Sequence, residues 1–288
     1  MINSNVEVFI GCNSNFEDAD IVLFGAPFDG TTSYRPGTRF GSKAIRSESY
    51  GIETYSPYQD EDLEDYNIFD SGDIELCFGN TERVLADIEE RTREIILNNK
   101  IPGMIGGEHL VTLGAVRALV SKYEDLHIIH FDAHTDLRED YLGEKLSHAS
   151  VIRRVWDIVG DNKIYQYGIR SGERNEFYWA KEHTNLTKFN FDGINIDVEG
   201  LKDVPVYLTI DLDVLDVSEF PGTGTPEAGG VTFKELLSAI ISVSSLNIVG
   251  FDVVELAPNY DLSGGSTATA CKVLREVILS ILSKKLSK

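Results

Sequence analysis

The chain has 288 residues, of which 42% are hydrophobic, enough to bury a sizeable core. Its formal net charge of −21 argues against a nucleic-acid partner, which needs clustered lysine and arginine, and is compatible with a cationic substrate. The three cysteines are scattered without paired spacing, the first residues lack the regions of a signal peptide, and no apolar stretch is long enough to span a bilayer. We therefore expect a cytoplasmic protein without a membrane partner.

Short apolar runs typical of buried parallel strands recur along the chain. They are residues 21–25, 101–105, 126–131, 163–169, 205–210 and 248–254. Helix-like segments lie between several of them, at 81–98, 112–122, 149–159, 232–243 and 267–282. This alternation predicts an α/β fold with a central, mainly parallel sheet flanked by helices. No repeat or linker marks a boundary, so we expect residues 1–288 to form a single domain.

Acidic and imidazole side chains stand where four of these strands end. The residues are His109, Asp132, Asp211, Asp213 and Glu255. The carboxyl ends of parallel strands meet at one edge of a sheet, where ligands bind. Because side chains alternate in an extended chain, Asp132, His134 and Asp136 are expected to project to one side.

The expected cluster contains four carboxylates and two imidazoles. Without cations the carboxylates would repel one another and raise each other's pKa, whereas two divalent ions would neutralise them. Oxygen-rich ligation without thiolate favours an ion such as Mn²⁺, although spacing alone does not choose among Mn, Co, Ni and Zn. Two such ions about 3.5–4 Å apart can bridge a water, lower its pKa and orient it as a nucleophile. A solvated loop is the alternative for residues 132–136 taken alone.

Three motifs carry these residues. They are GGEH at 106–109, DAHTD at 132–136 and TIDLDVLDVSEFPGTGTPEAGG at 209–230. They resemble the signatures of the ureohydrolases, the arginase and agmatinase family, and the resemblance extends from SYRPGTRFGSKAIR near the start to ELAPNYD near the end. It implies the arginase-like three-layer fold and a homo-oligomer, either a trimer or a hexamer.

The resemblance also implies a role for each matching residue. Two Mn²⁺ ions per subunit would be held by His109, Asp132, His134, Asp136, Asp211 and Asp213. His148 would move protons, Glu255 would pair with the substrate guanidinium, and Asp136 would also accept a hydrogen bond from the nucleophilic hydroxide. The chain departs from the family at Val217 and Phe220, where other members commonly have the pairs DP and AP, so local packing can differ there.

Three further features have less direct interpretations. His130 precedes the end of its strand and is expected to be a buried, hydrogen-bonded histidine rather than a ligand. Asp252 is expected to orient a ligand instead of binding metal. The glycine-rich segment 25–41 lacks the nucleotide-binding patterns, and the resemblance places it near the mouth of the active site.

The implied reaction is hydrolysis of a guanidino group to urea and an amine, and the expected substrate is agmatine, which yields putrescine. Arginases have an asparagine where Arg138 stands, and the loop 137–148 has no excess of positive charge with which to capture a carboxylate. Arg138 nevertheless keeps 4-guanidinobutyrate as an alternative substrate, because one guanidinium can bind a carboxylate. The competing hypotheses are formiminoglutamate hydrolysis, a single-metal centre of the deacetylase type, and a metal-binding module without catalysis.

Overall fold

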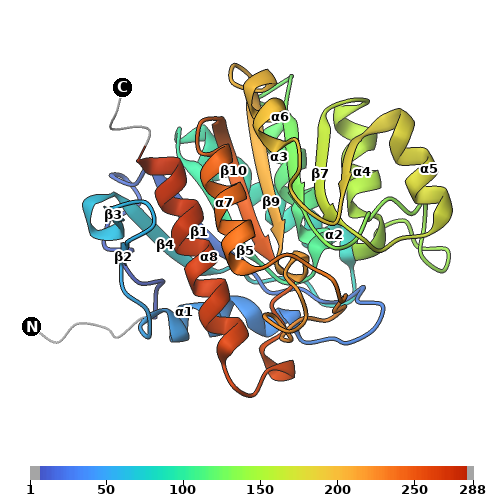
Figure 1. Cartoon of the computed structure of the whole chain (residues 1–288). Coiled ribbons are helices and arrows are strands. Elements are labelled where there is room, and N and C mark those ends of the chain that lie inside the picture. The colour runs from blue at the N-terminus through green and yellow to red at the C-terminus, as the bar shows by residue number, and fades with distance from the viewer. Residues whose placement is uncertain (1–6, 284–288) are drawn as a thin grey trace, which may run out of the picture.

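The computed structural model describes residues 7–283, in which a central eight-stranded sheet lies between two layers of helices (Figure 1). The strand order is β4-β1-β5-β10-β9-β6-β7-β8, and every pairing between neighbours is parallel. The strands are β1 (Ile21–Ala26), β4 (Ile68–Asp73), β5 (Ile101–Gly106), β6 (His127–Phe131), β7 (Ile164–Ile169), β8 (Asn185–Lys188), β9 (Pro205–Asp211) and β10 (Asn247–Val254). A separate antiparallel pair is formed by β2 (Tyr55–Ser56) and β3 (Glu61–Asp62).

The helices divide between the two faces of the sheet. One hydrophobic core includes residues of α1 (Gly41–Ser49), α6 (Ile194–Gly200), α7 (Phe233–Val243) and α8 (Gly265–Leu282). The other includes residues of α2 (Thr81–Leu97), α3 (Thr112–Leu119), α4 (Val151–Val159) and α5 (Arg174–His183). Figure 1 shows α7 and α8 in front of the sheet and α2 and α3 behind it. None of the described helices is long and apolar enough to cross a membrane.

Short 3-10 turns connect several of these elements. They are η1 (Thr38–Phe40), η2 (Leu63–Asp65), η3 (His109–Val111), η4 (His148–Ser150), η5 (Leu212–Val214) and η6 (Pro258–Tyr260). Three of them, η3, η4 and η5, carry residues of the predicted site. These residues therefore lie on turns that follow a strand or precede a helix, where their side chains can face one edge of the sheet.

The predicted strands and helices are confirmed, with boundaries that move by at most three residues. The sequence did not reveal β2, β3, β4, β8, α1, α5 or α6. The strands β4 and β8 form the two edges of the sheet and lack a continuous apolar run. In β4, Asp70 and Asp73 bind Arg46 of α1, so a buried ion pair takes the place of apolar packing.

The sheet order brings the predicted site together. Strands β5, β10, β9 and β6 are neighbours in the middle of the sheet, and each is followed by a residue of the site. The assumption of an extended chain fails beyond β6, because Asp136 has a left-handed backbone with φ 52°. The turn of the backbone, and not strand alternation alone, therefore sets the direction of Asp136.

The segment that departs from the family is well packed. The side chain of Phe220 is fully buried, and its amide donates to the carbonyl of Asp216 at 2.9 Å. The carboxylate of Asp216 accepts hydrogen bonds from the amides of Ser218, Gly229 and Gly230 at 2.7–3.0 Å. The carboxylate of Asp216 thus closes this loop by hydrogen bonding.

Candidate metal centre and active site

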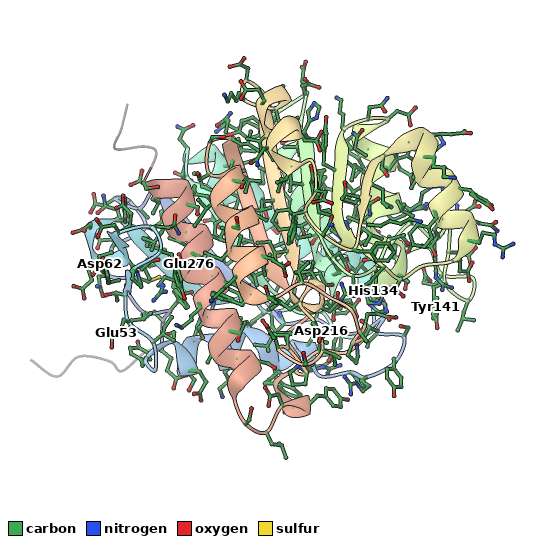
Figure 2. The ribbon with its side chains drawn as sticks, in the orientation of Figure 1. Glu53, Asp62, His134, Tyr141, Asp216 and Glu276 are labelled. Atoms are coloured by element: carbon green, nitrogen blue, oxygen red, sulfur yellow. The ribbon has the colours of Figure 1, made fainter. Side chains whose placement is uncertain are left out.

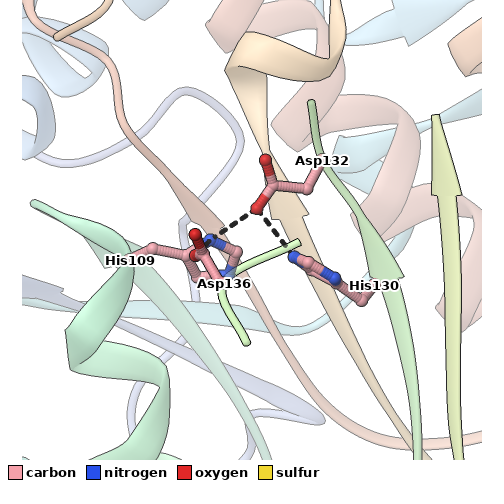
Figure 3. A group of neighbouring side chains, drawn as sticks. All are labelled: His109, His130, Asp132 and Asp136. Atoms are coloured by element: carbon pink, nitrogen blue, oxygen red, sulfur yellow. Dashed lines mark hydrogen bonds and ion pairs between the residues drawn. The ribbon is translucent and has the colours of Figure 1, made fainter. Parts of the chain in front are cut away.

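The predicted ligands converge at the carboxyl edge of the sheet. Two overlapping groups have donor atoms that lie within 4.8 Å of one another. The first contains His109, His130, Asp132 and Asp136, and the second contains Asp132, His134 and Asp213. Figure 3 shows the side chains of the first group turned toward one another. Asp211 joins them, since its Oδ2 lies 3.2 Å from Nδ1 of His109.

His109 presents one ring nitrogen to these carboxylates. Its Nδ1 lies 3.1 Å from an oxygen of Asp132 and 3.4 Å from one of Asp136, and none of the nearby oxygens lies in the direction of a hydrogen bond. Its Nε2 lies 2.9 Å from Oγ1 of Thr209. The hydroxyl of Thr209 donates its own hydrogen to Asp252 at 2.6 Å. Nε2 of His109 must therefore be the donor in its contact with Thr209. In its neutral form the ring therefore aims the Nδ1 lone pair into the cluster.

Asp252 has the orienting position that the sequence predicts. It is fully buried and accepts hydroxyl hydrogen bonds from Thr209, Thr112 and Tyr207 at 2.6–2.7 Å. Through Thr209 it fixes the ring of His109. Partners of this kind are typical of histidines that bind metal.

His130 is a fully buried, hydrogen-bonded histidine, as predicted. The amide nitrogen of Gln166, which can only donate, lies 3.1 Å from Nδ1 of His130. The opposite nitrogen, Nε2, must then donate to Asp132 at 2.7 Å. Both ring nitrogens are occupied, so His130 supports the carboxylate of Asp132 and offers no free lone pair.

Backbone amides hold the carboxylates in place. The amide of His134 donates to Asp132 at 2.6 Å, and the amide of Asp213 donates to Asp211 at 2.8 Å. The amide of Ala133, in the second motif, donates to the carboxylate of Asp213, in the third motif, at 3.2 Å. Such local bonds are typical of aspartate in turns. Here they link the loops after β6 and β9.

The electrostatics of the cluster reflect crowded negative charge. Burial opposes the protonation of His109, yet the surrounding carboxylates, Asp132 first, raise its pKa well above the usual value. Burial, together with repulsion from Asp213, raises the pKa of Asp211 well above its ordinary range. Both shifts favour the uptake of protons by the cluster, and divalent cations bound there would compete with those protons.

The donor set fits two metal ions. The two groups share Asp132, so two ions held by them would be neighbours with a common ligand. The inward lone pair of His109 and the Nδ1 of His134, 3.0 Å from Asp213, supply imidazole ligands among the carboxylates. Carboxylate and imidazole without thiolate suit divalent ions such as Mn²⁺ and Zn²⁺.

His148 and Glu255 lie beside this cluster and contact each other. Nδ1 of His148 is 3.6 Å from Oε1 of Glu255, which also accepts the backbone amide of His109 at 2.8 Å. The amide of Ser33 donates to Nε2 of His148 at 3.0 Å. Burial lowers the pKa of His148, but Glu255, together with Asp136 and Glu108, raises it by more, so the pKa lies above its usual value. Ser33 belongs to the segment 25–41, which therefore does lie at the site.

A cavity of about 270 Å³ opens over the cluster. Its wall includes His134, Asp136, His148 and Asp211 from the site, and Arg138 and Tyr141 from the loop that follows the second motif. Figure 2 shows His134 and Tyr141 at the same end of the sheet. Glu255 does not line this cavity, although it contacts His148, which does.

Comparisons with known proteins agree with this geometry. The sequence model of the Arginase family matches residues 19–280. The chain belongs to the Arginase family. Over 96% of its length it is 49% identical to the agmatinase of Bacillus subtilis (strain 168), of which it covers 97%. The resemblance to the ureohydrolases seen in the sequence is thereby confirmed.

Solved structures of this family share the fold. One from Clostridium difficile has a TM-score of 0.92 and 55% identity, and the match covers 94% of this chain and 100% of that one. The agmatine ureohydrolase of Thermoplasma volcanium has a TM-score of 0.88 and 33% identity, with 99% of this chain and 97% of that one covered. The arginase-like three-layer fold predicted from the sequence is therefore correct.

Several residues around the site were not predicted. Glu108 is fully buried beside His109 and holds the segment 25–41 through Thr31, whose amide donates to it at 2.8 Å. Burial raises the pKa of Glu108 to about 7. Its position inside GGEH was a signal that could have been used. Glu173 and Glu176, on the wall of the cavity, belong to no motif, and only the fold reveals them.

Proposed function

We propose that the protein hydrolyses agmatine to putrescine and urea. It is a hydrolase of the Arginase family, and one observation selects the substrate. Among the described residues that line the cavity, Arg138 is the only lysine or arginine, and Glu173 and Glu176 both lie beside it. A substrate carboxylate would therefore meet a cation that is already paired. The cationic amine of agmatine meets a wall with more acidic than basic groups.

Two Mn²⁺ ions would be held by His109, Asp132, His134, Asp136, Asp211 and Asp213. When bound, they would supply an activated water as the nucleophile. Manganese is proposed because carboxylates outnumber imidazoles in this set. Asp136 faces the cavity and would accept a hydrogen bond from the attacking oxygen.

The residues of the chain would manage the protons. The oxygen of water forms a bond to the guanidinium carbon, and the bond from that carbon to the substituted nitrogen breaks. The leaving amine needs a proton, which the doubly protonated ring of His148 on the cavity wall would give. Glu255 favours that form by raising the pKa of His148, and the form requires Nε2 to leave the amide of Ser33 that donates to it here. Glu255 would stabilise the charged form of His148 and pair with the guanidinium. The products are urea and putrescine.

A substrate panel tests this proposal. Urea release from agmatine, arginine and 4-guanidinobutyrate is measured side by side on protein loaded with Mn²⁺, with apoprotein as the control. We expect kcat/KM for agmatine to exceed that for arginine by about a hundredfold or more, the scale set by unpaired charged groups. Equal or faster turnover of either competitor would overturn the choice of agmatine while leaving the hydrolase chemistry intact.

We propose a homo-oligomer, a trimer or hexamer, that acts in the cytoplasm and supplies putrescine for polyamine biosynthesis. The three unpaired cysteines, one of them exposed, suit a reducing compartment. Gel filtration with light scattering measures the number of subunits, and a dissociated monomer would contradict the proposed assembly.

A further inference from the structure

We propose that Glu173 determines whether the site accepts a cationic or an anionic substrate tail, because Glu173 neutralises the charge of Arg138. The inference rests on the proposed function, because it concerns the tail that leaves as the amine. It assigns a specificity role to a residue outside all three motifs. Glu173 is a positioning residue in this proposal, since it acts on the substrate mainly through Arg138.

Arg138 stands where a substrate tail would pass. Its guanidinium lines the cavity together with Asp136 and His134, and its NH1 lies 3.0 Å from Oε1 of Glu173. The guanidinium also lies over the ring of Tyr141, at 5.3 Å from the centroid. An unpaired arginine at this place would bind a carboxylate in bidentate fashion. The contact with Glu173 occupies one of the two guanidinium nitrogens that would bind such a carboxylate.

Glu176 cannot fully replace Glu173. Its carboxylate is buried and accepts hydrogen bonds from the hydroxyl of Thr135, the amide of Leu137 and the amide of Glu173, at 2.5–3.0 Å. It lies 3.8 Å from Nε of Arg138, beyond hydrogen-bonding distance. Glu173 makes the shorter contact, and 59% of its side chain is exposed toward solvent.

The backbone fixes Glu173 over the cavity. Ser171 pairs with the second motif, donating to the carbonyl of Ala133 at 2.9 Å and accepting from the amide of Thr135 at 3.0 Å. Gly172 follows with φ 155°, and a Cβ there would come within 2.6 Å of Thr135. Only glycine suits this close approach. The position of Glu173 is thus tied to the strand end that carries the proposed ligands.

The charge on this wall explains the expected preference. Glu173 and Glu176 together outweigh Arg138 by one negative charge, which favours a cationic tail. In Glu173→Gln the charges of Arg138 and Glu176 balance each other, and NH1 of Arg138 becomes available to a carboxylate. Residue 173 caps α5 through its backbone, since its amide donates to Glu176 at 2.6 Å and its carbonyl accepts from the amide of Glu176 at 3.0 Å, and glutamine keeps both hydrogen bonds. The substitution therefore changes charge with little effect on the helix.

The experiment compares wild type with Glu173→Gln, Arg138→Gln and the double variant, using agmatine and 4-guanidinobutyrate. Glu182→Gln is the matched control, because Glu182 is exposed on the same helix and does not line the cavity. We expect Glu173→Gln to shift the kcat/KM ratio toward 4-guanidinobutyrate by about tenfold, a size limited by the exposure of the ion pair. The double variant should lose the gain. An unchanged ratio in Glu173→Gln, or a gain that persists without Arg138, overturns the inference.

Binding of the tails alone separates this inference from the proposed function. Thermal shifts measured with putrescine and with 4-aminobutyrate need no catalysis. In Glu173→Gln the thermal shift caused by putrescine should become smaller, and the shift caused by 4-aminobutyrate should become larger. Wild type that prefers 4-guanidinobutyrate refutes agmatine as the substrate. Wild type that prefers agmatine, with no change of tail preference in Glu173→Gln, refutes only the role of Glu173.

Discussion

The contact between Thr209 and His109 allows a sharp test of the metal centre. Thr209→Val removes one hydroxyl from a fully buried position while nearly preserving the shape of the side chain. Nε2 of His109, which lies 2.9 Å from the oxygen of that hydroxyl, loses the acceptor of its hydrogen bond, and Asp252 loses one of three hydroxyl donors. An unsatisfied buried polar group costs about 1–3 kcal/mol, so the free energy of unfolding should fall by roughly that amount.

Metal affinity should fall as well, because the ring of His109 is no longer oriented. Loss of a residue that supports a metal-binding histidine typically weakens metal binding by about 10–100-fold. Titration against a competing chelator measures the Kd for Mn²⁺, and denaturant unfolding with and without Mn²⁺ separates the two effects. The stabilisation by bound metal should shrink in the variant, since metal binds the native state.

Thr112→Val is the matched control. Thr112 is fully buried and donates to Asp252 at 2.7 Å, but it has no hydrogen bond to His109. The variant Thr112→Val should therefore lose stability, but its loss of metal affinity should be much smaller than that of Thr209→Val. Equal losses of affinity in the two variants, or an unchanged Kd in Thr209→Val, would refute the orientation of His109 through Thr209.

Three other variants test separate parts of the site and fold. Asp132→Asn removes the carboxylate shared by both ligand groups, so metal analysis after gel filtration should find fewer than two ions per chain; an unchanged content and affinity would contradict the ligand assignment. Glu255→Gln should lower kcat/KM for agmatine by about 30-fold or more with both ions retained, since losing a buried charged partner costs about 2–5 kcal/mol. Near-normal activity would remove Glu255 from the mechanism. Asp261 accepts hydrogen bonds from Ser263 and Ser266, first among the causes that lower its pKa to about 2, so its stabilising effect is present above about pH 4 and is lost as the pH falls toward 2. The stability difference between wild type and Asp261→Asn should shrink over that range, and a difference that is constant from pH 5 to 2 would exclude this role.

The central strands could be predicted from the sequence because both of their faces are buried. Strand β9, for example, has almost no exposed residue, so its apolar run is continuous. The edge strand β8 is exposed or half-buried throughout, and its residues Asn185–Lys188 carry no such pattern. Strand β4 was missed for a different reason, since Asp70 is buried against Arg46, a residue far away in the sequence. A local pattern cannot reveal a charge that a distant partner neutralises.

The sequence by itself determined which residues gather at the carboxyl edge, because short motifs after strands carry the acids and imidazoles, and parallel strands end at the same edge. It also indicated that His130 is a hydrogen-bonded histidine, which Gln166 and Asp132 confirm. Only the tertiary structure decided how these groups are oriented and what surrounds the substrate. The tautomer of His109 depends on Thr209, 100 positions later, and the charge of Arg138 is balanced by Glu173 across two separate loops. Hydrogen bonds and ion pairs act over a few ångströms in space, whereas a motif records only neighbours along the chain.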